Sequence, residues 1–193
     1  MKEIILLGIS TALINNMVFS KSLGICPLLG VSKKLDSSIG MGGAVVFVVI
    51  LASLTSWTID RFFLYPLNLE YLRTIVYILV IASLVQLVEM VIHKNSPGLY
   101  KALGIYLPLI TTNCMVLGTV LLIFQKDYAF FEMIAFSTGA GTGFAMAMVI
   151  MAGLREKLVF SKIPKVFQGA SIALITISIL SLAFLGFAGL IRG

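Results

Sequence analysis

The stretch LGICPLLGVSKKL, from Leu23 to Leu35, interrupts and then ends the first apolar run of this sequence. It places a cysteine directly before a proline, Cys26-Pro27, in a segment that is otherwise apolar enough for a membrane. Proline lacks a backbone N–H and clashes with the preceding helical turn, so a continuous helix through Pro27 is disfavoured. We therefore expect the first membrane-spanning segment to be broken in this stretch.

The composition around this stretch predicts an all-α integral membrane protein. Hydrophobic residues make up 60% of the chain and charged residues 11%, whereas charged residues are about a quarter of a soluble domain. The mean hydropathy is +1.10. The net charge of +6 does not indicate nucleic-acid binding, because the basic residues lie between apolar runs, where they set membrane topology. No small-residue cleavage site follows the first run, so we expect it to be retained.

Six apolar runs are about as long as the roughly 20 residues that a crossing helix needs. The separators contain Pro, Asn, Ser and charged residues, which are typical of loops. Together the runs predict a single membrane domain, residues 1–193, with six spans at about Ile4–Leu29, Gly40–Ile59, Thr74–Ile92, Ala102–Phe124, Met133–Leu154 and Gly169–Ile191.

The basic residues predict how these spans are oriented. Cytoplasmic loops carry an excess of Lys and Arg. One side of the six-span layout holds nine of the fourteen basic residues: Lys21, Lys33, Lys34, Lys94, Lys101, Arg155, Lys157, Lys162 and Lys165. We therefore expect loops 1–2, 3–4 and 5–6 in the cytoplasm and both termini outside.

The two halves of the chain, about 1–95 and 96–193, contain similar short sequence strings. GMGGAVVFVVI (Gly40–Ile50) and GAGTGFAMAMVI (Gly139–Ile150) both open with closely spaced glycines, which we expect to allow close helix packing or bending. LINNMV (Leu13–Val18) also resembles LITTNCMV (Leu109–Val116). Three spans per half is an odd number, so the second copy enters the membrane from the opposite face. Such inverted repeats place their functional site near the midplane, on broken helices. The alternative is that any two apolar stretches share Leu, Ile and Gly.

Each half also carries one polar break and one cysteine. The first run contains Asn15-Asn16, Lys21 and Cys26-Pro27, and the fourth contains Pro108 followed by Thr111-Thr112-Asn113-Cys114. Unpaired amides and hydroxyls cost several kcal/mol in hydrocarbon, so both clusters should face protein or a cofactor. We expect helices 1 and 4 to be broken near the midplane.

Several functions are compatible with two cysteines. A cysteine in a membrane helix is usually a small hydrophobic residue, as in a cofactor-free transporter or channel subunit. Thiol exchange normally uses a CxxC pair, which is absent. A metal centre is the third option, since two thiolates are half of the four that a [2Fe–2S] cluster usually takes. The remaining two would have to come from another chain, because the only histidine, His93, lies in an expected loop.

Long motifs then identify a family. LGICPLLGVSKKLDSSIGMG (Leu23–Gly42), PLNLEYLRT (Pro66–Thr74) and SPGLYKALGIYLPLITTNCMVLG (Ser96–Gly118) resemble the A-type membrane subunits of Rnf complexes, the ion-translocating ferredoxin:NAD oxidoreductases. The resemblance runs from end to end and includes Asn15-Asn16, AGLREKL (Ala152–Leu158) and QGASIALIT (Gln168–Thr176). The related subunit of the sodium-translocating NADH:quinone reductase is the alternative, although it tends to have Glu-Asn and Cys-Thr where this chain has Asn15-Asn16 and Cys26-Pro27.

The resemblance implies a subunit of a complex in the bacterial cell inner membrane that couples electron transfer between ferredoxin and NAD to translocation of Na⁺ or H⁺. It implies a homologous, inverted partner of the E type, and further subunits of the B, C, D and G types, which carry flavins and other iron–sulfur clusters. Cys26 and Cys114 fall on the family's cysteine positions, so the resemblance implies that they bind half of one [2Fe–2S] cluster shared with the E-type partner. In this interpretation Pro27 ends a half-helix and Cys26 meets iron at its tip.

The expected role is an electron relay and half of an ion gate, with no catalytic residue of its own. Polar residues near the breaks are candidates for donors to the cluster or for contacts with the ion. Hydrogen bonds between helices are an equally good explanation for each of them. The candidates are Asn15, Asn16, Thr111, Thr112 and Asn113.

Overall fold

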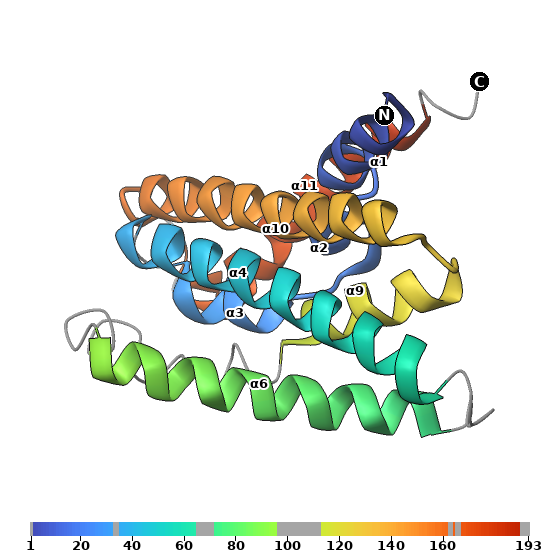
Figure 1. Cartoon of the computed structure of the whole chain (residues 1–193). Helices are drawn as coiled ribbons and strands as arrows, with labels where there is room; N and C mark the ends of the chain where they lie inside the picture. Colours follow the sequence, from blue (N-terminus) through green and yellow to red (C-terminus); the bar gives the residue numbers. More distant parts are fainter. Residues whose placement is uncertain are drawn as a thin grey trace.

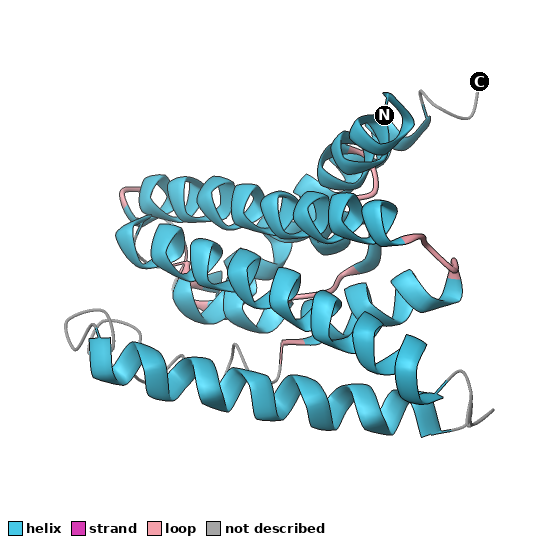
Figure 2. Ribbon diagram, in the orientation of Figure 1, coloured by secondary structure: helices cyan, strands magenta, loops and turns pink. Residues whose placement is uncertain are grey.

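The computed structural model describes residues 2–32, 35–64, 72–95, 113–161, 164 and 167–189. The described residues form helices and short turns, and none of them lies in a strand (Figure 2). In chain order the helices are α1 (Lys2–Leu13), α2 (Met17–Lys21), α3 (Ile25–Val31), α4 (Leu35–Ile59) with a π-helical extension η1 (Asp60–Leu64), α6 (Arg73–Asn95), α9 (Cys114–Gln125), α10 (Phe130–Val159) and α11 (Ala170–Gly189).

Helices α4 and α10 form the centre of the molecule. They lie side by side in opposite directions (Figure 1). Helix α1 packs on α10, α9 packs on α4, α6 covers α4 and α9, and α11 contacts α2, α3 and α10. The buried core between them is made of aliphatic, methionine and aromatic side chains, including Val45, Val49, Met115, Phe144 and Met148.

Small residues let the central helices approach closely. A Cβ added at Gly42 would lie 3.1 Å from the Cβ of Ala145, and one at Gly141 would lie 3.2 Å from the Cα of Val46. At Gly139 an added Cβ would collide with the backbone carbonyl of Gly8 on α1. The expectation that these glycines serve close packing is confirmed at these positions. Gly43 differs, because it faces open space.

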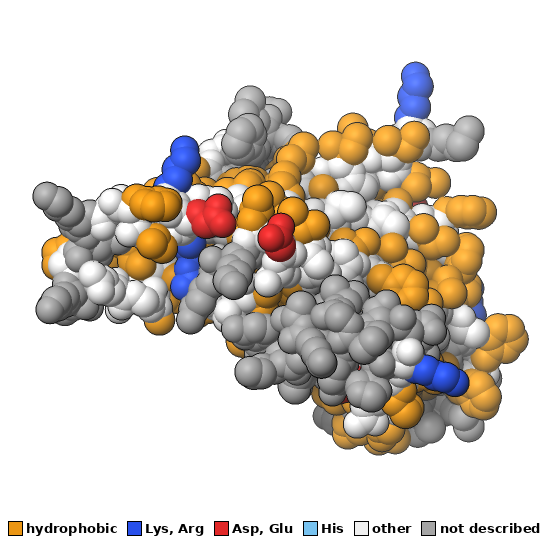
Figure 3. Space-filling view, turned by 90° about the vertical axis from the view of Figure 1, so that its left-hand side faces the viewer, with side chains coloured by type: hydrophobic (Ala, Val, Ile, Leu, Met, Phe, Trp, Pro, Cys, Tyr) orange, Lys and Arg blue, Asp and Glu red, His pale blue; other side chains and the backbone are white. Residues whose placement is uncertain are grey.

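Several of the expected apolar runs are helical in the structure. The segments Leu35–Leu64, Arg73–Met90 and Phe130–Val159 are long and apolar enough to cross a membrane, and Cys114–Gln125 and Ala170–Gly186 are shorter apolar helices. Many large apolar side chains point outward, among them Leu6 at 70% exposure and Phe62 at 72%. In Figure 3 apolar side chains cover much of the described surface on the face shown, and charged side chains are few. Such a surface suits lipid or partner helices rather than water.

The first apolar run is broken, as the sequence predicts, and it is broken twice. Helix α1 ends at Leu13, α2 covers Met17–Lys21, and α3 begins at Ile25. The fourth run is helical from Cys114, where α9 begins. Residues 96–112, which include Pro108, Thr111 and Thr112, lie outside the described part of the chain.

The prediction that Pro27 ends a half-helix is wrong. Pro27 is the third residue of α3, in its first turn. The first N–H groups of a helix have no partner within it, so a proline in the first turn gives up no helical hydrogen bond. The chain bends earlier instead, at Ser22 and Gly24, whose φ angles are +55° and +83°. Cys26 therefore lies at the start of a helix that runs on to Val31.

Candidate functional site

The two cysteines lie at the N-terminal ends of two short helices from opposite halves of the chain. Cys26 is the second residue of α3 and is exposed, whereas Cys114 is the first residue of α9 and is half-buried. N–H groups at a helix start lack partners within the helix and carry partial positive charge. Such N–H groups are available to donate hydrogen bonds to an acceptor at this position.

One hydrogen bond joins these two helix ends. The backbone N–H of Gly24 donates to Sγ of Cys114, with an N···S distance of 3.0 Å. Gly24 is the residue before α3 begins, so the sulfur of Cys114 lies at the N-terminal end of the helix that carries Cys26. The sequence places both cysteines on broken helices. The packing of α2, α9 and α10 brings the two ends together.

Gly24 is the residue that allows this approach. An added Cβ there would lie 2.7 Å from Cε2 of Phe144 on α10 and 3.3 Å from the Cβ of Met115 on α9. Its φ of +83° is also in the region that side-chain-bearing residues rarely adopt. Both the conformation and the space therefore require glycine.

Asn16 lies at the break between α1 and α2, and both Oδ1 and Nδ2 of its side chain form hydrogen bonds. Its Oδ1 accepts a hydrogen bond from the N–H of Val18 at 3.0 Å, which caps α2. Its Nδ2 donates to the carbonyls of Ala12 at 3.0 Å and Gly143 at 2.9 Å. The side chain is 1% exposed. Asn16 thus connects α1, α2 and α10, and its role in the described structure is to hold the break in place.

Asn113 is the N-cap residue of α9, as Asn16 is of α2, but its side-chain nitrogen is not paired. Its Oδ1 accepts from the N–H of Met115 at 3.0 Å, the same cap two residues along. Its Nδ2 is buried and has no hydrogen-bond partner in the described structure, although the residue is only 3% exposed. An unpaired buried donor is costly and calls for an explanation, such as an acceptor that is bound in the working protein. This donor lies in the residue directly before Cys114.

The remaining polar candidates separate clearly. Asn15 is exposed in the turn between α1 and α2, and Thr111 and Thr112 lie outside the described residues.

Sequence reasoning missed Gly24, because a glycine in an apolar run gives no sign that its N–H donates to a sulfur 90 residues away. The positive φ that marks this glycine is visible only in three dimensions.

Sequence reasoning also missed the part that Arg155 plays in holding α3. Its Nη1 donates to the carbonyl oxygen of Leu29 at 2.8 Å and to Oγ of Ser32 at 2.9 Å. A cation at the C-terminal end of a helix satisfies unpaired carbonyls and complements the helix dipole. Helix α3 is therefore held at its start by the contact with Cys114 and at its end by Arg155.

The two thiols do not form a complete metal site by themselves. Over the described ranges, no three or more His, Cys, Asp or Glu side chains gather closely enough to bind a metal ion. The exposed position of Cys26 leaves its sulfur accessible from outside the chain. Any metal centre at this site would need ligands in addition to those that the described residues bring together.

Comparisons with known proteins agree along the whole sequence. A family model described as Rnf-Nqr subunit, membrane protein, matches residues 4–191. A protein of Glaesserella parasuis, named as the A-type subunit of an ion-translocating oxidoreductase complex, is 54% identical over 192 residues, which is 100% of both chains. Proteins of the same name are 53% identical in Serratia proteamaculans and 50% identical in Syntrophotalea carbinolica, again over 100% of both chains. Together with the apolar helices, these matches mean that the chain belongs to the Rnf-Nqr family of membrane subunits.

Proposed function

We propose that this chain is the A-type subunit of an ion-translocating ferredoxin:NAD oxidoreductase and that Cys26 and Cys114 bind half of a [2Fe–2S] cluster. The relatives named above are subunits of ion-translocating oxidoreductase complexes, which supports the general role. The site at the start of α3 and α9 supports the cluster. The other two ligands would come from the homologous, inverted E-type partner in the same complex, which also contains subunits of the B, C, D and G types.

The observation that carries the proposal is the 3.0 Å hydrogen bond from the N–H of Gly24 to Sγ of Cys114. It brings together the two helix ends that bear the only cysteines in the chain. N–H···S bonds of this kind stabilise metal-bound thiolates and tune their reduction potential.

The residues present fit the donor set that half of a cluster requires. There are two thiols, both at helix starts, where backbone N–H groups without a helical partner are available as donors. Cys26 is exposed and so is accessible to a partner chain. The unused Nδ2 of Asn113 supplies a buried donor in the residue next to one of the sulfurs.

The arrangement of six spans in two inverted halves is part of the same proposal. Asn16 and Asn113 cap α2 and α9 in the same way, each through the N–H two residues further on. The strings NMV at 16–18 and NCMV at 113–116 share Asn, Met and Val, although one is a residue longer, and the similar caps support a relation between the halves. In this arrangement both termini lie outside the cell membrane, and loops 1–2, 3–4 and 5–6 lie in the cytoplasm.

When bound, the cluster supplies one-electron transfer between redox centres on other subunits. This chain binds and orients its half of the ligands and keeps water away with the apolar core around Met115 and Phe144. The double break in the first run makes α3 a separate short element, held at each end by one set of hydrogen bonds. We propose that the movement of such half-helices opens a path for Na⁺ or H⁺ alternately to either side.

The test is to purify the intact complex anaerobically and to record its iron content and EPR spectrum. We expect Cys26→Ser and Cys114→Ser each to remove one [2Fe–2S] signal and to stop ferredoxin-driven NAD reduction while the complex still assembles. Ser20→Ala, an exposed position on α2, is the control and should keep both. If both cysteine variants keep the full signal and activity, the cysteines are packing residues and the chain is a cofactor-free transport subunit.

A further inference from the structure

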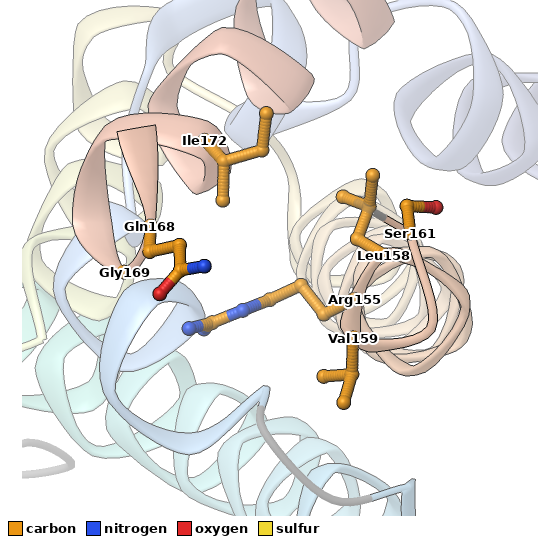
Figure 4. A pocket seen from close by; sticks show the side chains of 7 residues that line it. All are labelled: Arg155, Leu158, Val159, Ser161, Gln168, Gly169 and Ile172. Atoms are coloured by element: carbon orange, nitrogen blue, oxygen red, sulfur yellow. The ribbon is translucent and has the colours of Figure 1, made fainter. Parts of the chain in front are cut away.

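A cavity separates the end of α10 from the start of α11. It has a volume of about 420 Å³. Its lining is apolar on one part and polar on the other: Leu158, Val159 and Ile172 contribute alkyl groups, and Arg155, Ser161, Gln168 and Gly169 contribute polar groups. Figure 4 shows the side chain of Arg155 extending from α10 toward Gln168, with Ile172 above it. Of these residues, Arg155 also holds the C-terminal end of α3.

Arg155 is a fixed cation with donors to spare. Its Nη1 is held by the carbonyl of Leu29 and the hydroxyl of Ser32. Its Nε and Nη2 make no hydrogen bond to a residue that the structure describes, and it forms no ion pair with a described carboxylate. A guanidinium in a set position, with several N–H groups in a planar fork, is suited to phosphate oxygens.

The depth of the cavity fits the headgroup layer of a membrane. With 30 residues, α10 is about 45 Å long, whereas the hydrocarbon core is about 30 Å thick. The excess length allows one end of α10 to extend beyond the hydrocarbon, and the charged run Arg155-Glu156-Lys157 favours the end that lines the cavity. Phosphates of phospholipids lie at this depth, next to the acyl chains that alkyl side chains would contact.

The local sequence is basic. Between residues 155 and 165 the chain has Arg155, Lys157, Lys162 and Lys165, and Glu156 is the single acidic residue. Basic pockets between membrane helices bind anionic lipid headgroups. A zwitterionic headgroup would gain less from this charge.

We propose that the cavity between α10 and α11 binds an anionic phospholipid, with its phosphate on Arg155 and its glycerol and first acyl carbons on Leu158, Val159 and Ile172. The same guanidinium caps α3, so the bound phosphate would hold Arg155 in the position that α3 requires. The lipid would then act as a structural ligand of the helix that carries Cys26. The lipid site itself does not depend on the cluster proposal.

The test uses the intact complex in nanodiscs made of phosphatidylcholine with a minor fraction of phosphatidylglycerol, followed by detergent extraction and native mass spectrometry. Ile172→Trp fills the cavity and leaves Arg155 in place. Ile175→Trp, on the exposed side of α11, adds the same bulk outside the cavity. Arg155→Gln removes the cation, and Lys157→Gln removes a nearby exposed charge that does not line the cavity.

We expect the wild type, Ile175→Trp and Lys157→Gln to retain one more phosphatidylglycerol than Ile172→Trp and Arg155→Gln do. Equal retention in Ile172→Trp and Ile175→Trp would overturn the site. If the wild type retained phosphatidylcholine as well as it retains phosphatidylglycerol, recognition by charge would be overturned. Retention of inorganic phosphate by lipid-free complex, with no bound lipid, would assign the cavity to a free anion instead. Absence of any bound lipid in the wild type would also overturn the proposal.

Discussion

Gly24 and Cys114 are ninety residues apart in the sequence, and a 3.0 Å hydrogen bond from the backbone N–H of one to the sulfur of the other joins the two halves of the chain. This contact places the sulfur of Cys114 at the N-terminal end of the helix that carries Cys26. It also places a glycine with a positive φ at the centre of the proposed electron relay.

Substitution of this glycine should damage both stability and the site. In Gly24→Ala the left-handed backbone alone costs about 1–2 kcal/mol, and the new Cβ would meet the ring of Phe144 at 2.7 Å. We expect a lower thermal unfolding midpoint for the purified complex and less iron per complex. Gly43→Ala, which faces open space on α4, should change neither. If Gly24→Ala kept the unfolding midpoint and the iron content of the wild type, α3 would be able to begin with a different backbone conformation at residue 24.

The two capping asparagines should differ in what they control. Asn113→Ser keeps an acceptor for the cap of α9 and removes the unused buried donor Nδ2. We expect assembly to persist and the reduction potential of the proposed cluster to become more negative, because a donor near sulfur stabilises the reduced, more negative form. The potential is measured by EPR-monitored redox titration.

Asn16→Ser is the matched comparison for this experiment. It loses the two hydrogen bonds of Nδ2 to Ala12 and Gly143, each worth about 0.5–1.5 kcal/mol. Its effect should therefore appear in the unfolding midpoint and leave the potential unchanged. The assignment of roles fails if Asn16→Ser shifts the potential and Asn113→Ser does not.

A buried carboxylate connects the end of α4 to α6. Asp60 in η1 accepts a hydrogen bond from Nε of Arg73 at 2.9 Å and another from the hydroxyl of Tyr77 at 2.7 Å. Breaking a fully buried pair costs about 3–5 kcal/mol. Because the side chain of Arg73 is 26% exposed, we expect about 2 kcal/mol for Asp60→Asn.

The smaller change Tyr77→Phe removes one hydrogen bond and should cost about 1 kcal/mol. Thermal unfolding of the complex in detergent measures both variants, with Glu3→Gln, an exposed carboxylate on α1, as the control. An effect of Tyr77→Phe larger than that of Asp60→Asn would contradict this order.

The crossing of α1 and α10 depends on Gly139. A Cβ there would collide with the backbone carbonyl of Gly8, and backbone cannot rotate away as a flexible side chain can. We expect Gly139→Ala to lower stability by about 1–3 kcal/mol, as overpacking does. Gly153→Ala, on the same helix with nothing within 4 Å, should be neutral or slightly stabilising. Unfolding midpoints of the two variants provide the comparison, and equal values would show that α1 shifts freely.

The sequence by itself determined which of the described segments are helical, that they are apolar enough for a membrane, and that the first run is broken. These features depend on local composition: apolar length, loop residues and polar residues inside an apolar run. The packing role of the glycines in α4 and α10 could also be predicted, because small residues at close spacing permit close helix contact. The long motifs identified the family.

Only the tertiary structure decided where the first run bends and what meets at the bend. A proline is equally acceptable in the first turn of a helix and after its last, so the sequence could not assign Pro27 to the start of α3. The pairing of Gly24 with Cys114, and the hold of Arg155 on the end of α3, join residues at least ninety positions apart. Such contacts depend on how whole helices pack, and no local pattern encodes the packing of α10 against both α1 and α4 that brings them together.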